Sequence, residues 1–306
     1  DLNTMTKEDF PLVSIIVPNW NGKDDVLECL YSVRKQEYPK DKLEIIIIDN
    51  GSTDGSQKEI KNTIAKMQKE KWVHLELIEN KINLGSSIAR NQGIRASYGK
   101  SKYVWMLDND IVADPNALKE LVELGEKYRE IGILGSVNYY YNNPEEINYL
   151  GSMLNWKTWL FRDIYEKELA NSNAYFVDCV ATSSLLIKKE IINEIGMLDP
   201  EYFCYFNDVD WCLRAKKSGY RICFLRNSKI WHKVLHSTNK ISGFKIYYTT
   251  RNMIRLIKKN APHKKYIIFL LYLFIYFLPR NLVLLILQKN ISILSSLLKG
   301  LRDGLN

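Results

Sequence analysis

Short runs of β-branched residues alternate with amphipathic stretches through the first two thirds of this 306-residue chain. Side chains repeat every two residues in a strand and about every 3.6 residues in a helix, so the spacing assigns each run. Strands are predicted at residues 13–17, 43–48, 74–78, 103–107 and 131–134, and helices at residues 24–35, 56–69, 86–97 and 116–128. This alternation is typical of an α/β layer structure with a mostly parallel sheet.

Polar segments follow the first four predicted strands, at residues 18–21, 49–52, 83–85 and 108–110. In open α/β sheets the ligands bind beyond the carboxyl ends of the strands, so these segments are predicted to converge on one nucleotide site. No G-x-G-x-x-G follows the first strand and no G-x-x-x-x-G-K-[ST] occurs in the chain. A dinucleotide cofactor and a P-loop are therefore unsupported, and the phosphates need another counter-charge.

Asp108 and Asp110 lie two residues apart directly after a predicted buried strand, residues 104–107. Both carboxylates can face one divalent cation if the chain leaves regular strand geometry there. Hard oxygen ligands favour magnesium or manganese. The alternative is a solvated turn, but the buried strand delivers these acids to the ligand edge, which favours the metal site.

A second block with strand and helix signals runs from residue 176 to residue 232. Strands are predicted at residues 184–187 and 221–225, followed by the segment 230–232, and a helix is predicted from about Asp208 to Gly219, which suits the C′ position. An acid in the first turn of a helix, such as Asp208 or Asp210, can accept the free N–H groups there. A structural role for these acids therefore stays open beside a catalytic one.

The carboxyl-terminal part is basic and then apolar. The chain has a formal net charge of +8, and lysines and arginines become frequent from residue 229. An apolar run at residues 266–278 is expected to be broken by Pro279-Arg280-Asn281 before a second run at 282–287. A membrane-spanning helix needs about 20 apolar residues. An interfacial or re-entrant helix pair on an anionic membrane surface is preferred over a kinked span, a core or oligomer helix, or a nucleic-acid partner.

Two features indicate the compartment. The first ten residues are polar and acidic, unlike a signal peptide. The five cysteines are dispersed and lack the close pairing of a zinc site, so they are interpreted as buried hydrophobic residues in a reducing environment. We expect the protein to act at the cytoplasmic face of the cell membrane.

Taken in order, these motifs resemble a known family, the inverting family 2 glycosyltransferases with the GT-A fold, and in particular its rhamnosyltransferase-like and galactofuranosyltransferase-like members. The resemblance spans roughly residues 13–252. It is carried by the segments 13–21, 48–56, 83–93, 108–110, 196–214 and 231–232. It implies a Rossmann-like mixed sheet and three regions: a tail at 1–12, a catalytic domain at 13–235 and a helical membrane-associating region at 236–306. The nucleotide-sugar half of the catalytic domain would end near residue 137, with the acceptor half after it.

The resemblance also implies roles for single residues. Pro18, Asn19 and Trp20 would line the nucleoside, and Asp49 or Asn50 would hydrogen-bond its base, although residues 49–52 could instead form a simple turn. The full implied substrate-binding set is Pro18, Asn19, Trp20, Asp49, Asn50, Asn83, Gly85, Arg90, Asp108, Asn109 and Trp231.

Asp208 matches the catalytic base of the family, and His232 matches a position that supplies an imidazole ligand to the metal. Asp108, Asp110 and His232 would then hold Mn²⁺ or Mg²⁺, with imidazole favouring manganese. A lone histidine after an aromatic residue can also be structural. The chain departs from the family at Asn207, where glutamate is usual, and at Thr182-Ser183, where Gly-Ala is common.

The implied activity is single-displacement, inverting transfer of a sugar from a UDP- or dTDP-sugar, with dTDP-L-rhamnose among the candidates, to a lipid-linked glycan acceptor. The alternatives are a catalytically silent nucleotide-sugar-binding membrane scaffold and a nucleotide-sugar pyrophosphorylase. The pyrophosphorylases open with a glycine-rich loop after the first strand, and Pro18-Asn19-Trp20-Asn21 is not such a loop.

Overall fold

The computed structural model describes residues 8–155, 157–169, 172–233, 243–287 and 291–306. Its strands are β1 (Val13–Asn19), β2 (Leu43–Asp49), β3 (His74–Glu79), β4 (Tyr103–Leu107), β5 (Ile111–Ala113), β6 (Ile131–Tyr140), β7 (Asn143–Tyr149), β8 (Ser152–Asn155), β9 (Leu160–Asp163), β10 (Ala174–Val177), β11 (Ser184–Lys188) and β12 (Arg221–His232). Its α-helices are α1 (Lys23–Arg34), α2 (Ser56–Met67), α3 (Ser86–Ala96), α4 (Ala117–Lys127), α5 (Lys189–Ile195), α6 (Asn207–Lys217), α7 (Gly243–Asn260), α8 (His263–Tyr272), α9 (Leu278–Leu287) and α10 (Ile291–Leu305).

Ten of these strands form one mixed sheet. The order along it is β10-β12-β6-β11-β4-β1-β2-β3, with β5 beside β12 and β7 beside β6. Strands β4, β1, β2 and β3 are parallel, as predicted, but β11 runs antiparallel between β4 and β6. Strands β6 and β12 are also parallel, whereas β5, β7 and β10 pair antiparallel, so the sheet as a whole is mixed, as the resemblance implies.

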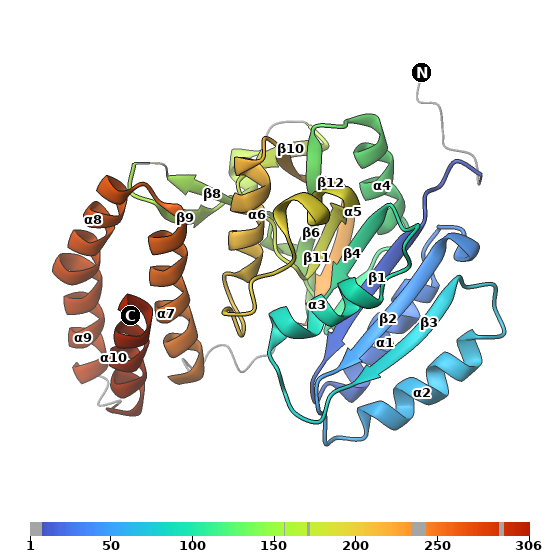
Figure 1. The fold of residues 1–306 in the computed structure, drawn as a ribbon, viewed down its shortest axis with the longest axis horizontal. Helices are drawn as coiled ribbons and strands as arrows, with labels where there is room; N and C mark the ends of the chain where they lie inside the picture. The colour runs from blue at the N-terminus through green and yellow to red at the C-terminus, as the bar shows by residue number, and fades with distance from the viewer. Residues whose placement is uncertain (1–7, 156, 170–171, 234–242, 288–290) are drawn as a thin grey trace.

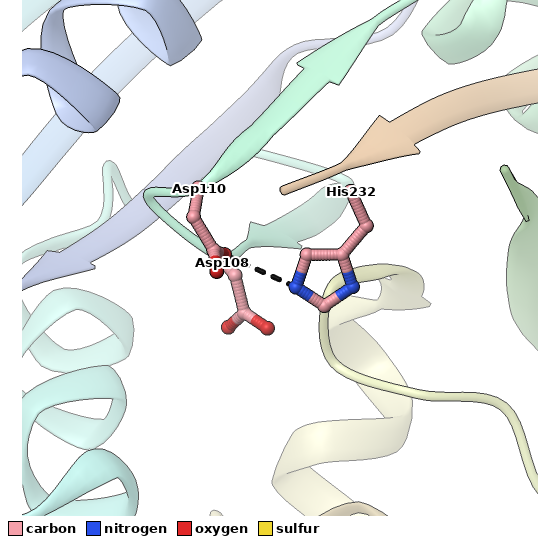
Figure 2. A group of neighbouring side chains, drawn as sticks. All are labelled: Asp108, Asp110 and His232. Atoms are coloured by element: carbon pink, nitrogen blue, oxygen red, sulfur yellow. Dashed lines mark ion pairs between the residues drawn. The ribbon is translucent and has the colours of Figure 1, made fainter. Parts of the chain in front are cut away.

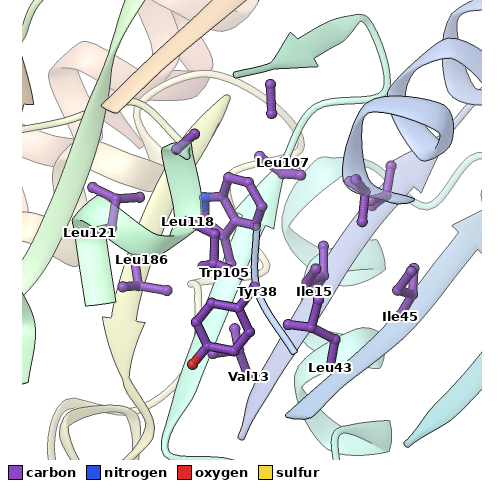
Figure 3. Close-up of a cluster of buried hydrophobic side chains, with 14 of the residues drawn as sticks. Val13, Ile15, Tyr38, Leu43, Ile45, Trp105, Leu107, Leu118, Leu121 and Leu186 are labelled. Carbon is purple, nitrogen blue, oxygen red and sulfur yellow. The ribbon is translucent and has the colours of Figure 1, made fainter. Parts of the chain in front are cut away.

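Helices cover both faces of the sheet (Figure 1). On β1, Val13, Ile15 and Val17 pack against α1, α2 and α4, whereas Ile16 packs against the face that carries α3, α5 and α6. Figure 3 shows part of the cluster that contains Val13 and Ile15, with the buried Trp105 of β4 at its centre. Because alternate residues of β1 enter different cores, a register slip of one residue would disrupt both.

The helices α7 to α10 pack together at one end of the molecule, and α7 is the one beside α6 (Figure 1). Their own core joins Ile254 and Ile257 of α7 to Phe269 of α8 and Leu297 and Leu301 of α10. None of the helices within the described ranges combines the length and the apolar character that a membrane span requires.

The expected break at residues 279–281 is absent. The chain stays helical from α8 into α9 through a π-helical segment, Leu273–Phe277, and Pro279 lies in the first turn of α9. A proline has no N–H to donate, and the wider π turn directly before it provides the local adjustment that this requires. All five cysteines are free thiols, and four of them are buried, as predicted for their side chains.

Candidate functional site

A cavity of about 860 Å³ opens where the carboxyl ends of β1, β2 and β4 meet the loop before α6. This volume lies within the range of small-molecule sites. The predicted residues that line it are Pro18, Asn19, Trp20, Asn50, Asn83, Gly85, Arg90, Asp108, Asn109, Asp208 and His232. Three predicted residues do not line it: Asp49, Asp110 and Trp231.

Asp108, Asp110 and His232 form a compact cluster (Figure 2), of which Asp108 and His232 line the cavity. One ligand atom from each lies within 4.8 Å of the others, and Nε2 of His232 is 3.1 Å from Oδ1 of Asp110. The pairing of β12 with β5 places His232 opposite Ile111, next to Asp110 in the chain. Two carboxylates and an imidazole form a donor set suited to manganese.

His232 has an altered proton affinity. Its burial alone would lower the pKa, but the hydrogen bond and charge of Asp110, together with the charge of Asp108, outweigh burial and raise the pKa of His232 above its ordinary value. The same negative charge that raises the pKa of this imidazole would attract a divalent cation to the cluster.

Arg90 of α3 is a buried cation inside the site. Its side chain is 3% exposed, and its guanidinium donates to Asp108 and to the hydroxyl of Ser86. Among the described residues its Nε has no hydrogen-bond partner. The sequence assigned Arg90 to substrate binding, and the structure adds that it neutralises part of the charge of Asp108.

Amide side chains fix the ends of β1, β2 and β4 relative to one another. Nδ2 of Asn109 donates to Asn19 at 2.8 Å, and Nδ2 of Asn50 donates to Asn83 at 2.8 Å. The carboxylate of Asp49 is fully buried behind this wall, where it accepts Nδ2 of Asn19 at 3.0 Å. Asp49 therefore positions Asn19 instead of reaching into the cavity, and Asn50 is the member of the pair that faces it.

Gly85 allows the loop before α3 to approach the loop before α6. Its φ is +87°, and a Cβ built there would lie 2.7 Å from the carbonyl oxygen of Phe203. Glycine alone tolerates this combination of dihedral angle and close contact.

Asp208 lies in the first turn of α6 and lines the cavity. Oδ1 accepts the N–H of Val209 at 2.9 Å, and Asp208 forms no ion pair within the described part of the chain. Burial raises the pKa of the Asp208 carboxyl, although the Val209 N–H and the charge of Arg90 act in the opposite direction. A carboxylate with a raised pKa is a better proton acceptor.

Asp210 has a different environment from Asp208. It is fully buried, and its carboxylate pairs with Arg214 at 2.9 Å and with Lys259 of α7 at 3.0 Å. This geometry assigns Asp210 a structural role, which the sequence had left open between the two acids.

Trp231 faces away from the cavity. Its indole N–H donates to the carbonyl of Pro144 at 3.2 Å, and its ring centroid lies 6.3 Å from that of Tyr139. In this structure Trp231 therefore does not line the cavity with the other predicted substrate-binding residues, because alternate side chains of β12 point to opposite faces and His232 takes the inner one.

The cavity also contains residues that the sequence did not identify. They come from the β7–β9 region, from the loop before α6 and from the start of α7: Tyr149, Asp163, Phe203, Tyr205, Phe244 and Lys245. Phe203 and Tyr205 lie within the segment 196–214 that carries the resemblance, whereas no local motif marks the other four, which reach the site through tertiary packing.

A mixed sheet with an Asp-x-Asp segment at the end of a central strand, facing an acid on a later helix, defines the GT-A class of fold. Residues 14–196 match the family model of glycosyl transferase family 2, and the chain belongs to that family.

The chain is similar to glycosyltransferase AglE of Haloferax volcanii, with 28% identity over 216 residues. That match covers 70% of this chain and 64% of the relative, so the chain spans under two thirds of its length. The N-acetylglucosaminyl-diphospho-decaprenol L-rhamnosyltransferase of Mycobacterium tuberculosis is 24% identical over 217 residues, covering 64% of this chain and 68% of that protein.

Among solved structures, the mannosyltransferase PcManGT of Pyrobaculum calidifontis, in complex with GDP-Man and Mn²⁺, superposes with a TM-score of 0.63. The two chains are 16% identical, and the match covers 96% of this chain and 87% of that one. At this identity the likeness establishes the fold alone.

Proposed function

We propose that this protein is an inverting, metal-dependent glycosyltransferase that moves a sugar from a nucleotide diphosphate to a hydroxyl of a lipid-linked glycan at the cytoplasmic face of a membrane. The observation that carries the proposal is one cavity that joins the Asp108–Asp110–His232 cluster to the separate carboxylate of Asp208. The cluster would then bind the diphosphate through a metal ion, and Asp208 would remove the proton of the acceptor.

Asp108, Asp110 and His232 would hold Mn²⁺ or Mg²⁺, and their spacing and donor chemistry fit such an ion. When bound, the ion would offset the negative charge of the diphosphate. Asn19, Trp20 and Asn50 line the part of the cavity that follows β1 and β2, which suits the nucleoside. The amide of Asn50 can pair with a uracil or thymine edge.

Asp208 would remove the proton of the acceptor hydroxyl as the oxygen attacks the anomeric carbon from the face opposite the diphosphate. A single displacement inverts the configuration at that carbon. The raised pKa of Asp208 and the absence of an ion pair to it in the described residues support this role.

The membrane part of the proposal rests on the outer face of α8 and the π-helical segment. Apolar side chains recur there at helical spacing, at Ile267, Leu271, Phe274 and Ile275. Together with Ile268 they are 44–72% exposed. A helix with such a face lies in the plane of a bilayer surface, held also by flanking lysines and arginines. The diphospho-decaprenol acceptor in the name of the mycobacterial relative supports a lipid-linked acceptor here.

A panel of nucleotide sugars with manganese, scored by release of the nucleoside diphosphate in the presence of lipid-linked acceptors, tests the proposal. Turnover that depends on both metal and acceptor supports it. Donor binding without turnover on any acceptor would favour the silent scaffold, and formation of nucleotide sugar from a sugar phosphate would favour a pyrophosphorylase.

A further inference from the structure

The turn that leads into α6 has an unfavourable backbone conformation. Tyr205 and Phe206, neither of them glycine, have φ angles of +60° and +64°. Side chains disfavour this left-handed region, so two such residues in succession persist only where the surroundings impose them. Phe206 is the N-cap of α6 and Asp208 lies in its first turn. The direction of the Asp208 side chain therefore depends on whatever holds this turn.

Asn252 of α7 holds the turn. Its side chain is fully buried, and Nδ2 donates to the carbonyl of Cys204 at 2.7 Å and to the carbonyl of Tyr205 at 3.1 Å. Its Oδ1 has no partner among the described residues. A buried amide with an unpaired oxygen is unfavourable compared with an apolar side chain. The favourable contribution of the Asn252 amide is therefore the two hydrogen bonds that it donates to the turn.

Neighbouring residues of α7 bind the segment before the turn. The guanidinium of Arg251 donates to the carbonyl of Glu201 at 2.8 Å, and Arg255 pairs with the Glu201 carboxylate at 2.5 Å. One turn further along, Lys259 pairs with Asp199 at 2.7 Å. The contacts of α7 therefore extend along the whole approach to α6.

Helix α10 fixes α7 from its other side. A Cβ on Gly300 would lie 2.7 Å from the carbonyl oxygen of Tyr247, and one on Gly304 would lie 3.0 Å from that of Arg251. Two glycines four residues apart thus let the two backbones approach closely. The position of α7, and with it that of Asn252, is set by the carboxyl-terminal helices.

We propose that Asn252 is a positioning residue for the transfer reaction, and that the carboxyl-terminal helices orient the base through it. This inference rests on the proposed function, in which Asp208 is the base. Asn252 keeps the Cys204–Phe206 turn in its left-handed conformation and so aims the first turn of α6 at the acceptor hydroxyl. It does not touch the donor.

Asn252→Leu keeps the size of the side chain and removes both donors. We expect kcat to fall about 10- to 100-fold, since a displacement near 1 Å in a catalytic group has that effect. The Kd for uridine or thymidine diphosphate with manganese should stay within about twofold. Asn260→Leu is the matched control, because Asn260 is also a buried amide of α7 but donates to Asp210, at 3.2 Å, and not to the turn. Its kcat should stay near that of the wild type.

A second substitution distinguishes positioning from general loosening. Glycine adopts the left-handed conformation without penalty. The fold-decrease in kcat caused by Asn252→Leu, measured against Tyr205→Gly alone, should therefore be at least about fivefold smaller than the decrease measured against the wild type. If the leucine variant does not fold, Asn252→Ala is compared in the same two backgrounds.

Three results would overturn the inference: a wild-type kcat in the Asn252 variants, an equal loss in Asn260→Leu, or an equal loss with and without Tyr205→Gly. Asp208→Asn is assayed in parallel. Turnover retained in that variant refutes the proposed function itself, whereas an inactive Asp208→Asn beside a fully active Asn252→Leu refutes the positioning role alone.

Discussion

Asp208→Asn should stop turnover without weakening the fold. The Asp208 carboxylate accepts the N–H of Val209 at 2.9 Å, and an amide oxygen can accept the same bond. Burial raises the pKa of Asp208, which means that this environment disfavours the charge that the substitution removes. The free energy of unfolding at neutral pH should therefore stay the same or increase.

The expected loss of activity follows from the role of the residue. A general base contributes about 10²- to 10⁴-fold to a rate, which corresponds to about 2.7–5.4 kcal/mol of transition-state stabilisation. The loss should appear in kcat, with the donor Kd unchanged, because the base acts on the acceptor. The assay is nucleoside diphosphate release at saturating donor and acceptor, with Tm measured on the same samples.

Asp210→Asn provides the control two residues away. Asp210 is fully buried and pairs with Arg214 and Lys259, so its neutralisation takes the carboxylate charge away from Arg214 and leaves Lys259 with Asp199 as its remaining ion pair. This should lower the free energy of unfolding by about 2–4 kcal/mol. The reasoning fails if Asp208→Asn keeps more than a tenth of wild-type turnover, or if it lowers Tm as much as Asp210→Asn does.

Three further predictions concern the metal, the pH dependence and the membrane. Excess chelator should abolish turnover, and manganese should restore it at least as well as magnesium. Asp110→Ala and His232→Ala should each weaken metal-dependent nucleotide binding by about tenfold or more. Activity in excess chelator would contradict the metal site. Burial raises the pKa of Asp208, so as the pH is lowered the base should become protonated, and kcat should fall, with a midpoint above the ordinary aspartate pKa of about 4. An acid limb of the pH–rate profile with a midpoint below that value would count against Asp208. Leu271→Glu and Ile275→Glu, on side chains 55% and 72% exposed, should release the protein from anionic liposomes without lowering Tm, and unchanged sedimentation would argue that this face contacts protein.

These glutamate substitutions test the membrane surface better than a deletion from residue 266 onward. Phe269, Leu273 and Leu297 pack against α7, so the deletion would expose the core around Ile254 and Ile257. The helix that carries Asn252 would lose its support, and the result would mix membrane release with damage to the site.

The local sequence determined the strands and helices of the amino-terminal half. The run from Leu43 to Asp49 is short, rich in isoleucine and buried at every position, and the apolar residues of α2 recur on one face, so composition identified the strand and spacing identified the helix without any tertiary information. The polar segments at strand ends were equally readable, because parallel strands place their carboxyl ends at the same edge. This is why Asn19, Asn50 and Asp108 were predicted together.

Tertiary structure decided how the remaining residues are used. The antiparallel pairing of β12 with β5 sets His232, and not Trp231, on the face that meets Asp110. The packing of α3 under the sheet edge brings the buried Arg90 to Asp108, and the packing of α10 on α7 places Asn252 at the turn before α6.

These contacts join residues far apart in the chain, for example 48 positions between Cys204 and Asn252. A local period reports which face of its own element a side chain occupies, but not which other element lies opposite that face. The sequence by itself therefore determined the elements and the edge of the sheet where the site forms. The order of the strands and the packing of the carboxyl-terminal helices determined which side chains meet there.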